Sequence, residues 1–187
     1  MRVVAGTYRG RMLGTLRGQA LRPTSDRLRE TLFDILGPTV AGSTFVDVYA
    51  GTGAVGIEAL SRGAHEAIFI ERHAAAVELI RRNLASLGVG PEADLLAMDA
   101  VRGLDLLVSR RLHAHFLFVD PPYAETGEYE RALDFLDRSP LLAPNGLVIV
   151  EHLRRGAMPK RLQTLERARV VEQGDAALSF YRLALAA

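Results

Sequence analysis

Short apolar runs alternate along the chain with longer segments whose apolar residues recur every three or four positions. The continuous runs lie at residues 44–48, 67–70, 93–97, 116–119 and 146–151. Their length and their β-branched and aromatic content indicate buried strands of a parallel sheet. The segments between them, such as 73–87, have the spacing of amphipathic helices. With right-handed crossovers, this alternation predicts an α/β fold with a doubly wound sheet.

The start of the chain departs from this alternation. Two short segments, 2–5 and 12–16, are separated by glycines and predict a β-hairpin arm outside the main domain. Residues 25–36 then have an apolar stripe at helical spacing, and Arg27 lies off that stripe. We therefore expect a helix whose polar face carries basic side chains.

The end of the chain predicts an antiparallel hairpin. Residues 168–173 and 178–185 flank a Gly-Asp turn, which brings the expected number of strands to seven. We expect an N-terminal arm over residues 1–24 and one domain with a seven-stranded, mostly parallel, Rossmann-like sheet over residues 25–187.

The composition narrows the possible chemistry. The 187 residues contain no cysteine, which excludes disulfides, thiolate metal sites and a cysteine nucleophile. The five histidines do not have the spacing of a metal site. No apolar run approaches the roughly 18 residues of a membrane span, and the start lacks the apolar region of a signal peptide. We expect a cytoplasmic protein that is not bound to a membrane and has no catalytic metal.

Positive charge is concentrated in two parts of the chain, although the formal net charge is only +1. Residues 1–31 contain seven arginines against two acidic residues. A second cluster consists of Arg154, Arg155, Lys160 and Arg161. Each of these residues taken alone is explained by an ordinary charged surface, but the two clusters together favour phosphate binding.

The run Asp120-Pro121-Pro122-Tyr123 follows the buried strand at 116–119. Proline cannot continue a ladder, so the strand must end at the acid. A carboxylate and a proline carbonyl are both acceptors only, which suits a planar amine with two hydrogens, and a tyrosine ring offers a stacking surface to the base that carries it. The run therefore predicts a site for alkylation of an exocyclic base amine. A simple strand-ending turn is the alternative interpretation.

A glycine-rich loop, Gly51-Thr52-Gly53-Ala54-Val55-Gly56, follows the strand at 44–48. Glycines let the backbone approach a ligand, and Glu71 at the tip of the next strand is placed to accept hydrogen bonds from a ribose. Asp99 follows the third strand and is either an adenine ligand or a helix cap. Several nucleoside cofactors fit this pattern, so it does not choose among them.

The two motifs follow the first and the fourth strand. In a doubly wound sheet these strands are neighbours at the topological switch point. We therefore expect the cofactor and the amine to face each other across one crevice.

With both motifs in place, the chain resembles the class I S-adenosylmethionine-dependent methyltransferases, and closely the RsmD-type methyltransferases of guanine N2 in bacterial 16S ribosomal RNA. The resemblance covers nearly the whole chain, and its most specific part is Leu21-Arg22-Pro23-Thr24-Ser25 with the following residues up to Phe33. Other matching parts are the arm at 6–11, the stretch 47–64, the run 120–123 and the tail at 174–181. Ala5 stands where a second glycine is expected in the arm.

The resemblance implies roles for individual residues. It implies that S-adenosylmethionine is bound by Asp47, Tyr49, Gly51, Gly53, Glu71, Arg72, Asp99 and Ala100. Asp120 and the Pro121 carbonyl, with Pro122, would hold the guanine amine while Tyr123 stacks on a flipped-out base. The implied RNA-binding residues are Arg9, Arg11, Arg22, Thr24, Arg27 and Arg29. The implied substrate is a small ribosomal subunit or its assembly intermediate, and we expect the enzyme to act as a monomer.

Two other activities remain open from the residues alone. A DNA adenine-N6 methyltransferase uses the same four-residue motif, but a chain this short has little room for a separate target-recognition domain. A nicotinamide-dependent oxidoreductase would use the glycine loop and Glu71, and would leave residues 120–123 unexplained. A non-catalytic RNA-binding module explains the least, because it needs neither acid.

Overall fold

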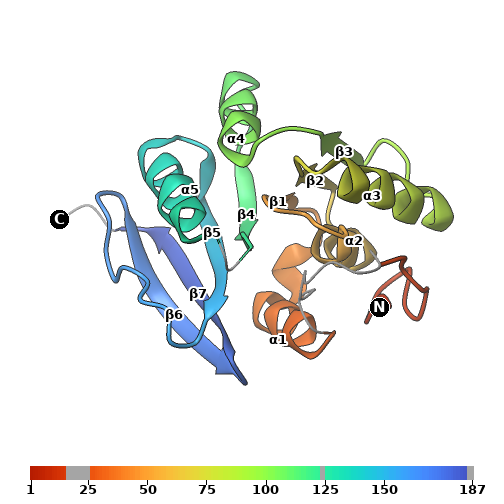
Figure 1. The fold of residues 1–187 in the computed structure, drawn as a ribbon, viewed down its shortest axis with the longest axis horizontal. Helices are drawn as coiled ribbons and strands as arrows, with labels where there is room; N and C mark the ends of the chain where they lie inside the picture. Colours follow the sequence, from red (N-terminus) through yellow and green to blue (C-terminus); the bar gives the residue numbers. More distant parts are fainter. Residues whose placement is uncertain (16–25, 123–124, 185–187) are drawn as a thin grey trace. The chain divides into compact units, whose positions relative to one another are not determined.

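The protein has a Rossmann-like α/β fold with a seven-stranded mixed sheet, as the alternating pattern predicts (Figure 1). The computed structural model describes residues 1–15, 26–122 and 125–184. The chain divides into two compact units, Met1–Ala100 and Val101–Ala187. None of the helices in these described ranges is both long and apolar enough to cross a membrane.

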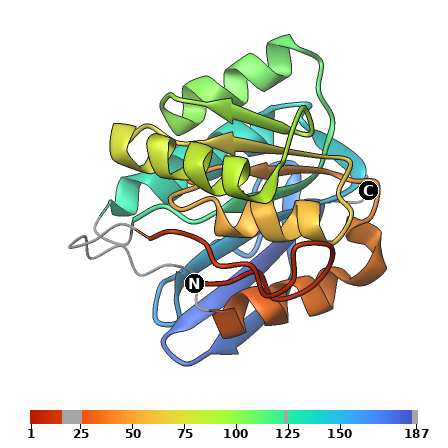
Figure 2. The same cartoon turned by 90° about the vertical axis from the view of Figure 1, so that its right-hand side faces the viewer.

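The first unit contains three parallel strands in the order β3-β2-β1. Its elements are α1 (Asp26–Leu36), a 3-10 helix (Gly37–Val40), β1 (Thr44–Asp47), α2 (Ala54–Ser61), β2 (Glu66–Ile70), α3 (Ala74–Leu87) and β3 (Ala93–Leu96). Helices α2 and α3 make the crossovers and lie on the same face of these strands (Figures 1 and 2). All eight residues of α2 are buried, so this helix forms the centre of the unit.

The N-terminal segment, residues 1–15, packs against α2 instead of extending away from the domain. The predicted hairpin has a single antiparallel bridge, between Arg2 and Met12, and no full strand. The physical reason is that the Val4 and Ala5 amides donate to the Glu58 carboxylate and are not available for a ladder. Val3 and Leu13 are buried in the core of the unit.

Gly6 makes this close packing possible. Its φ of 81° lies in the left-handed region, and a Cβ atom there would lie 1.8 Å from the Ser61 carbonyl oxygen. The next two amides, of Thr7 and Tyr8, donate to the carbonyl and the hydroxyl of Ser61 at 2.7 and 2.9 Å. Any other residue at position 6 would displace the segment from α2.

The second unit contains four strands in the order β4-β5-β7-β6. Its elements are α4 (Ala100–Ser109, which starts at the last residue of the first unit), β4 (Ala114–Val119), α5 (Thr126–Arg138), β5 (Leu142–Leu153), β6 (Leu165–Gln173) and β7 (Ala176–Leu183). Strands β4 and β5 are parallel, whereas β7 is antiparallel to both β5 and β6. The predicted C-terminal hairpin is therefore confirmed.

Candidate active site

The glycine loop joins the carboxyl end of β1 to α2 in the first unit. The last residue of β1, Asp47, accepts a hydrogen bond from the Gly56 amide at 3.0 Å. Gly53 caps α2 in a left-handed conformation with φ 77°, and its amide donates to the Ala50 carbonyl at 2.7 Å. This geometry turns the chain sharply at the start of a helix, which is where backbone N–H groups bind a ligand.

Glu71 closes the same loop from the tip of β2. One carboxylate oxygen accepts from the Gly51 amide and the other from the His73 amide, both at 2.8 Å. The residue is 7% exposed. Because each carboxylate oxygen can accept more than one hydrogen bond, the group keeps capacity for two ribose hydroxyls. The structure thus places the predicted acid beside the predicted loop.

Asp47 has an unusual acidity. Complete burial, partly opposed by the Gly56 hydrogen bond and reinforced by the neighbouring Glu71 carboxylate, raises the pKa of Asp47 to about 7. Two carboxylates next to the glycine loop make this end of the sheet a favourable place for a cationic ligand.

The remaining predicted cofactor residues lie near the same strand ends. Tyr49 is half-buried two residues after Asp47, and Arg72 is exposed directly after Glu71. Asp99 directly precedes α4, whose first residue is the buried Ala100. That position is compatible with a helix cap as well as with adenine binding, so both interpretations of Asp99 remain.

The amine-binding motif lies in the second unit, directly after β4. Asp120 is half-buried and Pro121 is buried. The Pro122 carbonyl accepts from the Glu125 amide at 2.8 Å and so closes a turn. Tyr123 lies outside the described residues. That the amine and the cofactor meet across a crevice stays a prediction.

Tyr129, in the first turns of α5, contacts the candidate amine-binding motif, which the sequence pattern did not predict. Its buried hydroxyl donates to the Pro121 carbonyl, with an oxygen-to-oxygen distance of 3.4 Å. A carbonyl oxygen has two lone pairs, so this contact orients the group and leaves one acceptor direction for a ligand. In the sequence, Tyr129 shares a helix face with the buried Leu133 and Leu136. A hydroxyl on such a face needs a hydrogen-bond partner, and this was the available sign of the contact.

The candidate RNA-binding residues separate into two groups. Arg9, Arg11 and Arg27 are exposed, and Arg11 donates to the Ser86 carbonyl at 2.6 Å. Arg22 and Thr24 lie outside the described residues.

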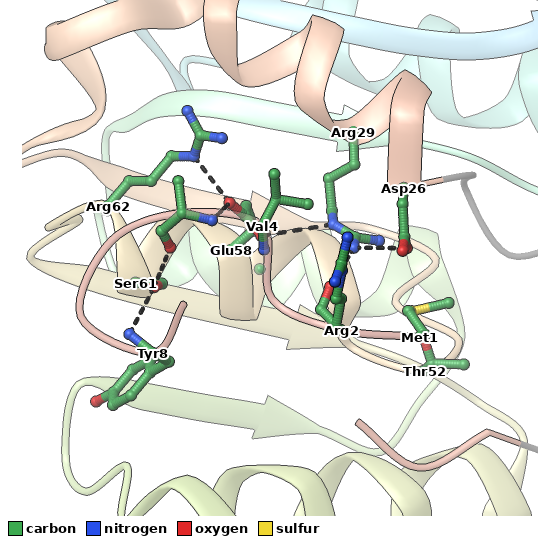
Figure 3. A network of polar contacts seen from close by, with 12 residues as sticks. Met1, Arg2, Val4, Tyr8, Asp26, Arg29, Thr52, Glu58, Ser61 and Arg62 are labelled. Carbon is green, nitrogen blue, oxygen red and sulfur yellow. Dashed lines mark hydrogen bonds and ion pairs between the residues drawn. The ribbon is translucent and has the colours of Figure 1, made fainter. Parts of the chain in front are cut away.

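Arg29 is a correction to the predicted set. Its side chain is completely buried, and one nitrogen, Nη2, donates to the Arg2 carbonyl at 2.6 Å and to Asp26 at 3.0 Å. Its Nε lies 3.6 Å from Glu58, which is also completely buried (Figure 3). With no exposed surface for RNA to contact, Arg29 ties α1 to the N-terminal segment and to α2.

The chain is similar to several known proteins over nearly its whole length. The family model described as "Conserved hypothetical protein 95" matches residues 1–182. The Haemophilus influenzae protein named "Ribosomal RNA small subunit methyltransferase D" is 34% identical over 186 residues, covering 98% of this chain and 92% of that protein. The solved structure of yhhF from Escherichia coli has a TM-score of 0.84 and 31% identity, and the match covers 98% of each chain.

A more distant structure, SMU.776, is described as complexed with SAH. It is 14% identical with a TM-score of 0.65, and the match covers 84% of this chain and 48% of that one. This likeness shows the fold alone. The near full-length match of the family model and of the Haemophilus relative shows more: this chain is a member of the RsmD family, whose model is described as Conserved hypothetical protein 95.

Proposed function

We propose that this protein transfers a methyl group from S-adenosylmethionine to the exocyclic N2 amine of a guanine in 16S ribosomal RNA. The observation that carries the proposal is the acceptor pair after β4, formed by the Asp120 carboxylate and the Pro121 carbonyl. Neither group can donate a hydrogen bond when the acid is ionised, so the pair selects a planar amine. The name of the Haemophilus relative supports ribosomal RNA as the substrate.

The chemistry follows from this pair. The lone pair of a base amine is delocalised into the ring, which makes the nitrogen a poor nucleophile. Asp120 and the Pro121 carbonyl accept its two hydrogens, and this favours a localised lone pair directed at the methyl carbon. Positioning and these two contacts supply most of the acceleration of a direct in-line displacement, without a covalent enzyme intermediate. The proton of the methylated amine passes to Asp120 or to solvent.

The first unit fits the proposed cofactor. S-adenosylmethionine supplies an electrophilic methyl group on a positively charged sulfur, so the transfer needs no metal ion. Glu71 would bind the ribose, the loop at 51–53 the methionine portion, and Asp99 with Ala100 the adenine. With its pKa raised to about 7, Asp47 would favour the positive charge of the methionine portion in its ionised form, and a bound cation would in turn favour that form.

We further propose that the substrate is a small ribosomal subunit or an assembly intermediate, in the cytoplasm, and that the enzyme acts as a monomer. The exposed Arg9, Arg11 and Arg27, together with Arg22 and Thr24, would contact the RNA backbone. Tyr123 would stack on the flipped-out guanine.

Methyl transfer to defined particles tests this function. Small subunits from cells that lack the protein are incubated with it and with labelled S-adenosylmethionine, and the modified nucleotide is mapped by mass spectrometry. We expect one N2-methylguanine in 16S ribosomal RNA. A label on adenine, or on duplex DNA in a parallel reaction, would refute the proposed target.

A further inference from the structure

A buried amide on α3 joins the N-terminal segment to the glycine loop. The Nδ2 of Asn83 donates to the Thr52 carbonyl at 2.9 Å, and its Oδ1 accepts from the Gly14 amide at 2.8 Å. The residue is 3% exposed. One side chain therefore contacts the backbone of two segments that are 38 residues apart in sequence, as the positions of Gly14 and Thr52 show.

The two partners fix the orientation of the amide. The Thr52 carbonyl can only accept and the Gly14 amide can only donate, so rotating the Asn83 amide by 180° would break both bonds. A buried polar group that loses its partner is costly. Asn83 consequently holds the glycine loop and the N-terminal segment at a fixed separation.

Other contacts connect the same two segments. The Thr52 hydroxyl contacts the Met1 sulfur at 3.7 Å. Within the N-terminal segment, the Leu13 amide donates to the Met1 carbonyl at 3.0 Å, which links Met1 to the part of the segment next to Gly14. Arg11 is bonded to α3 one turn beyond Asn83, through the Ser86 carbonyl. The segment that carries the exposed arginines and the loop that is proposed to bind the cofactor thus rest on one helix.

The position of Asn83 in the sequence supports a specific role. It falls beside the apolar stripe of α3, between the buried residues Ile80 and Leu84. Asparagine is a poor helix former and loses hydration when buried. An aliphatic residue would satisfy the helix and the core, so the amide is explained by its two bonds and by nothing else in α3.

We propose that Asn83 is a positioning residue that couples RNA binding to cofactor binding. A cofactor that orders residues 51–53 also stabilises the Thr52 carbonyl against Asn83, and this favours the docked N-terminal segment that presents Arg9 and Arg11. Linkage requires the reverse effect to have the same size, with typical couplings of about 5- to 150-fold. The inference rests on the proposed function, because it assumes that these arginines contact RNA.

A thermodynamic cycle measures the coupling. The ligand is S-adenosylhomocysteine (SAH), the product left when S-adenosylmethionine has given up its methyl group. The Kd of SAH is determined with and without the small subunit particle, and the Kd of the particle is determined with and without SAH. For the wild-type protein we expect each ligand to tighten the other by about 5-fold or more. For Asn83→Ala we expect a factor near one. Arg82→Ala, an exposed change at the neighbouring position of α3, should keep the wild-type factor.

Asn83→Asp separates positioning from a general loss of stability. Its carboxylate still accepts from the Gly14 amide but cannot donate to the Thr52 carbonyl. We expect the Gly14 amide to keep its protection from hydrogen exchange while SAH binding weakens. In Asn83→Ala the Gly14 protection should be lost as well, while SAH binding weakens but stays measurable.

The outcomes are distinguishable. A wild-type coupling factor in Asn83→Ala, or identical behaviour of the two Asn83 variants in SAH binding and in Gly14 protection, would overturn the inference. If the wild-type protein transfers no methyl group to the particle, the proposed function fails and this inference fails with it.

Discussion

Asp47 and Asp120 each follow a buried strand, but their surroundings give them different chemistry. Asp47 is enclosed at the end of β1 and bonded to the Gly56 amide, and burial raises its pKa to about 7. Asp120 is half-buried next to a proline carbonyl that Tyr129 orients. The first acid therefore has a charge that changes near neutral pH, whereas the second is the one proposed to accept from the amine.

Replacing Asp120 by alanine should stop methyl transfer without weakening cofactor binding. The change removes one of the two proposed acceptors for the amine and leaves all of the proposed cofactor residues in place. We expect kcat to fall by at least about 100-fold, the size of losing one preorganised transition-state contact. Single-turnover kinetics and calorimetry with SAH measure the two effects. Glu130→Ala, an exposed acid on α5, is the control, and retained turnover in Asp120→Ala would refute the role.

The pKa of Asp47 predicts how stability depends on pH. Because burial raises the folded-state pKa from 3.8 to about 7, the native protein binds more protons than the unfolded chain between these values. The contribution of Asp47 to stability is therefore lost as the pH rises from about 4 to about 7, by on the order of 4 kcal/mol in total, of which roughly 3 kcal/mol falls above pH 5. Urea unfolding at pH 5 and pH 8 should show a smaller loss in Asp47→Asn. Equal losses in the two proteins would contradict the assignment.

Helices α1 and α2 are joined by buried charges as well as by apolar contacts. Glu58 of α2 accepts the Val4 and Ala5 amides and pairs with Arg62 at 2.9 Å, and Arg29 of α1 lies against it (Figure 3). A buried charge is tolerated only with such partners. The network thus fixes the N-terminal segment on α2 in one position.

Arg27 and Arg29 are two residues apart and should respond differently to alanine substitution. Arg29→Ala leaves Glu58 with one fewer cationic partner in the interior, and we expect about 3 kcal/mol of lost stability. Arg27→Ala changes an exposed side chain and should stay within about 0.5 kcal/mol. Chemical denaturation compares them. Similar losses in both variants would argue against the buried ion pair.

The whole molecule is nearly neutral, so its proposed RNA affinity must come from local charge. With a formal net charge of +1, long-range attraction to a polyanion is weak. Arg9 and Arg11 are exposed on a segment that Glu58, Ser61 and Asn83 hold against the first unit. This anchoring presents both charges at fixed positions.

Removing Arg9 and Arg11 together should flatten the salt dependence of RNA binding. Each lost phosphate contact should reduce the slope of log K against log salt concentration by roughly 0.7 to 0.9. The affinity for 16S ribosomal RNA is measured by filter binding at several salt concentrations between about 50 and 300 mM, a range over which a protein that contacts several phosphates loses orders of magnitude in affinity. The double variant of Arg131 and Arg138 in α5 removes the same charge elsewhere. An unchanged slope would show that Arg9 and Arg11 do not contact RNA phosphates.

The sequence by itself determined most of the elements and the strand ends at which the two candidate motifs stand. Strand and helix follow from the spacing of apolar residues, and the glycine loop, Glu71 and the run 120–122 follow from rules that act between near neighbours in the chain. For this reason the predicted strands, the C-terminal hairpin and the position of Glu71 beside the glycine loop agree with the structure.

Only the tertiary structure decided which polar residues are buried and what they hold. Arg29 belonged to a polar helix face by its sequence, Tyr129 and Asn83 gave no clear sign of their partners, and the arm was expected outside the domain. Each role depends on a contact with a distant segment: Glu58 for Arg29, the Pro121 carbonyl for Tyr129, and Thr52 with Gly14 for Asn83. Burial and hydrogen-bond partners are set by packing between elements, and a local pattern contains no information about that packing.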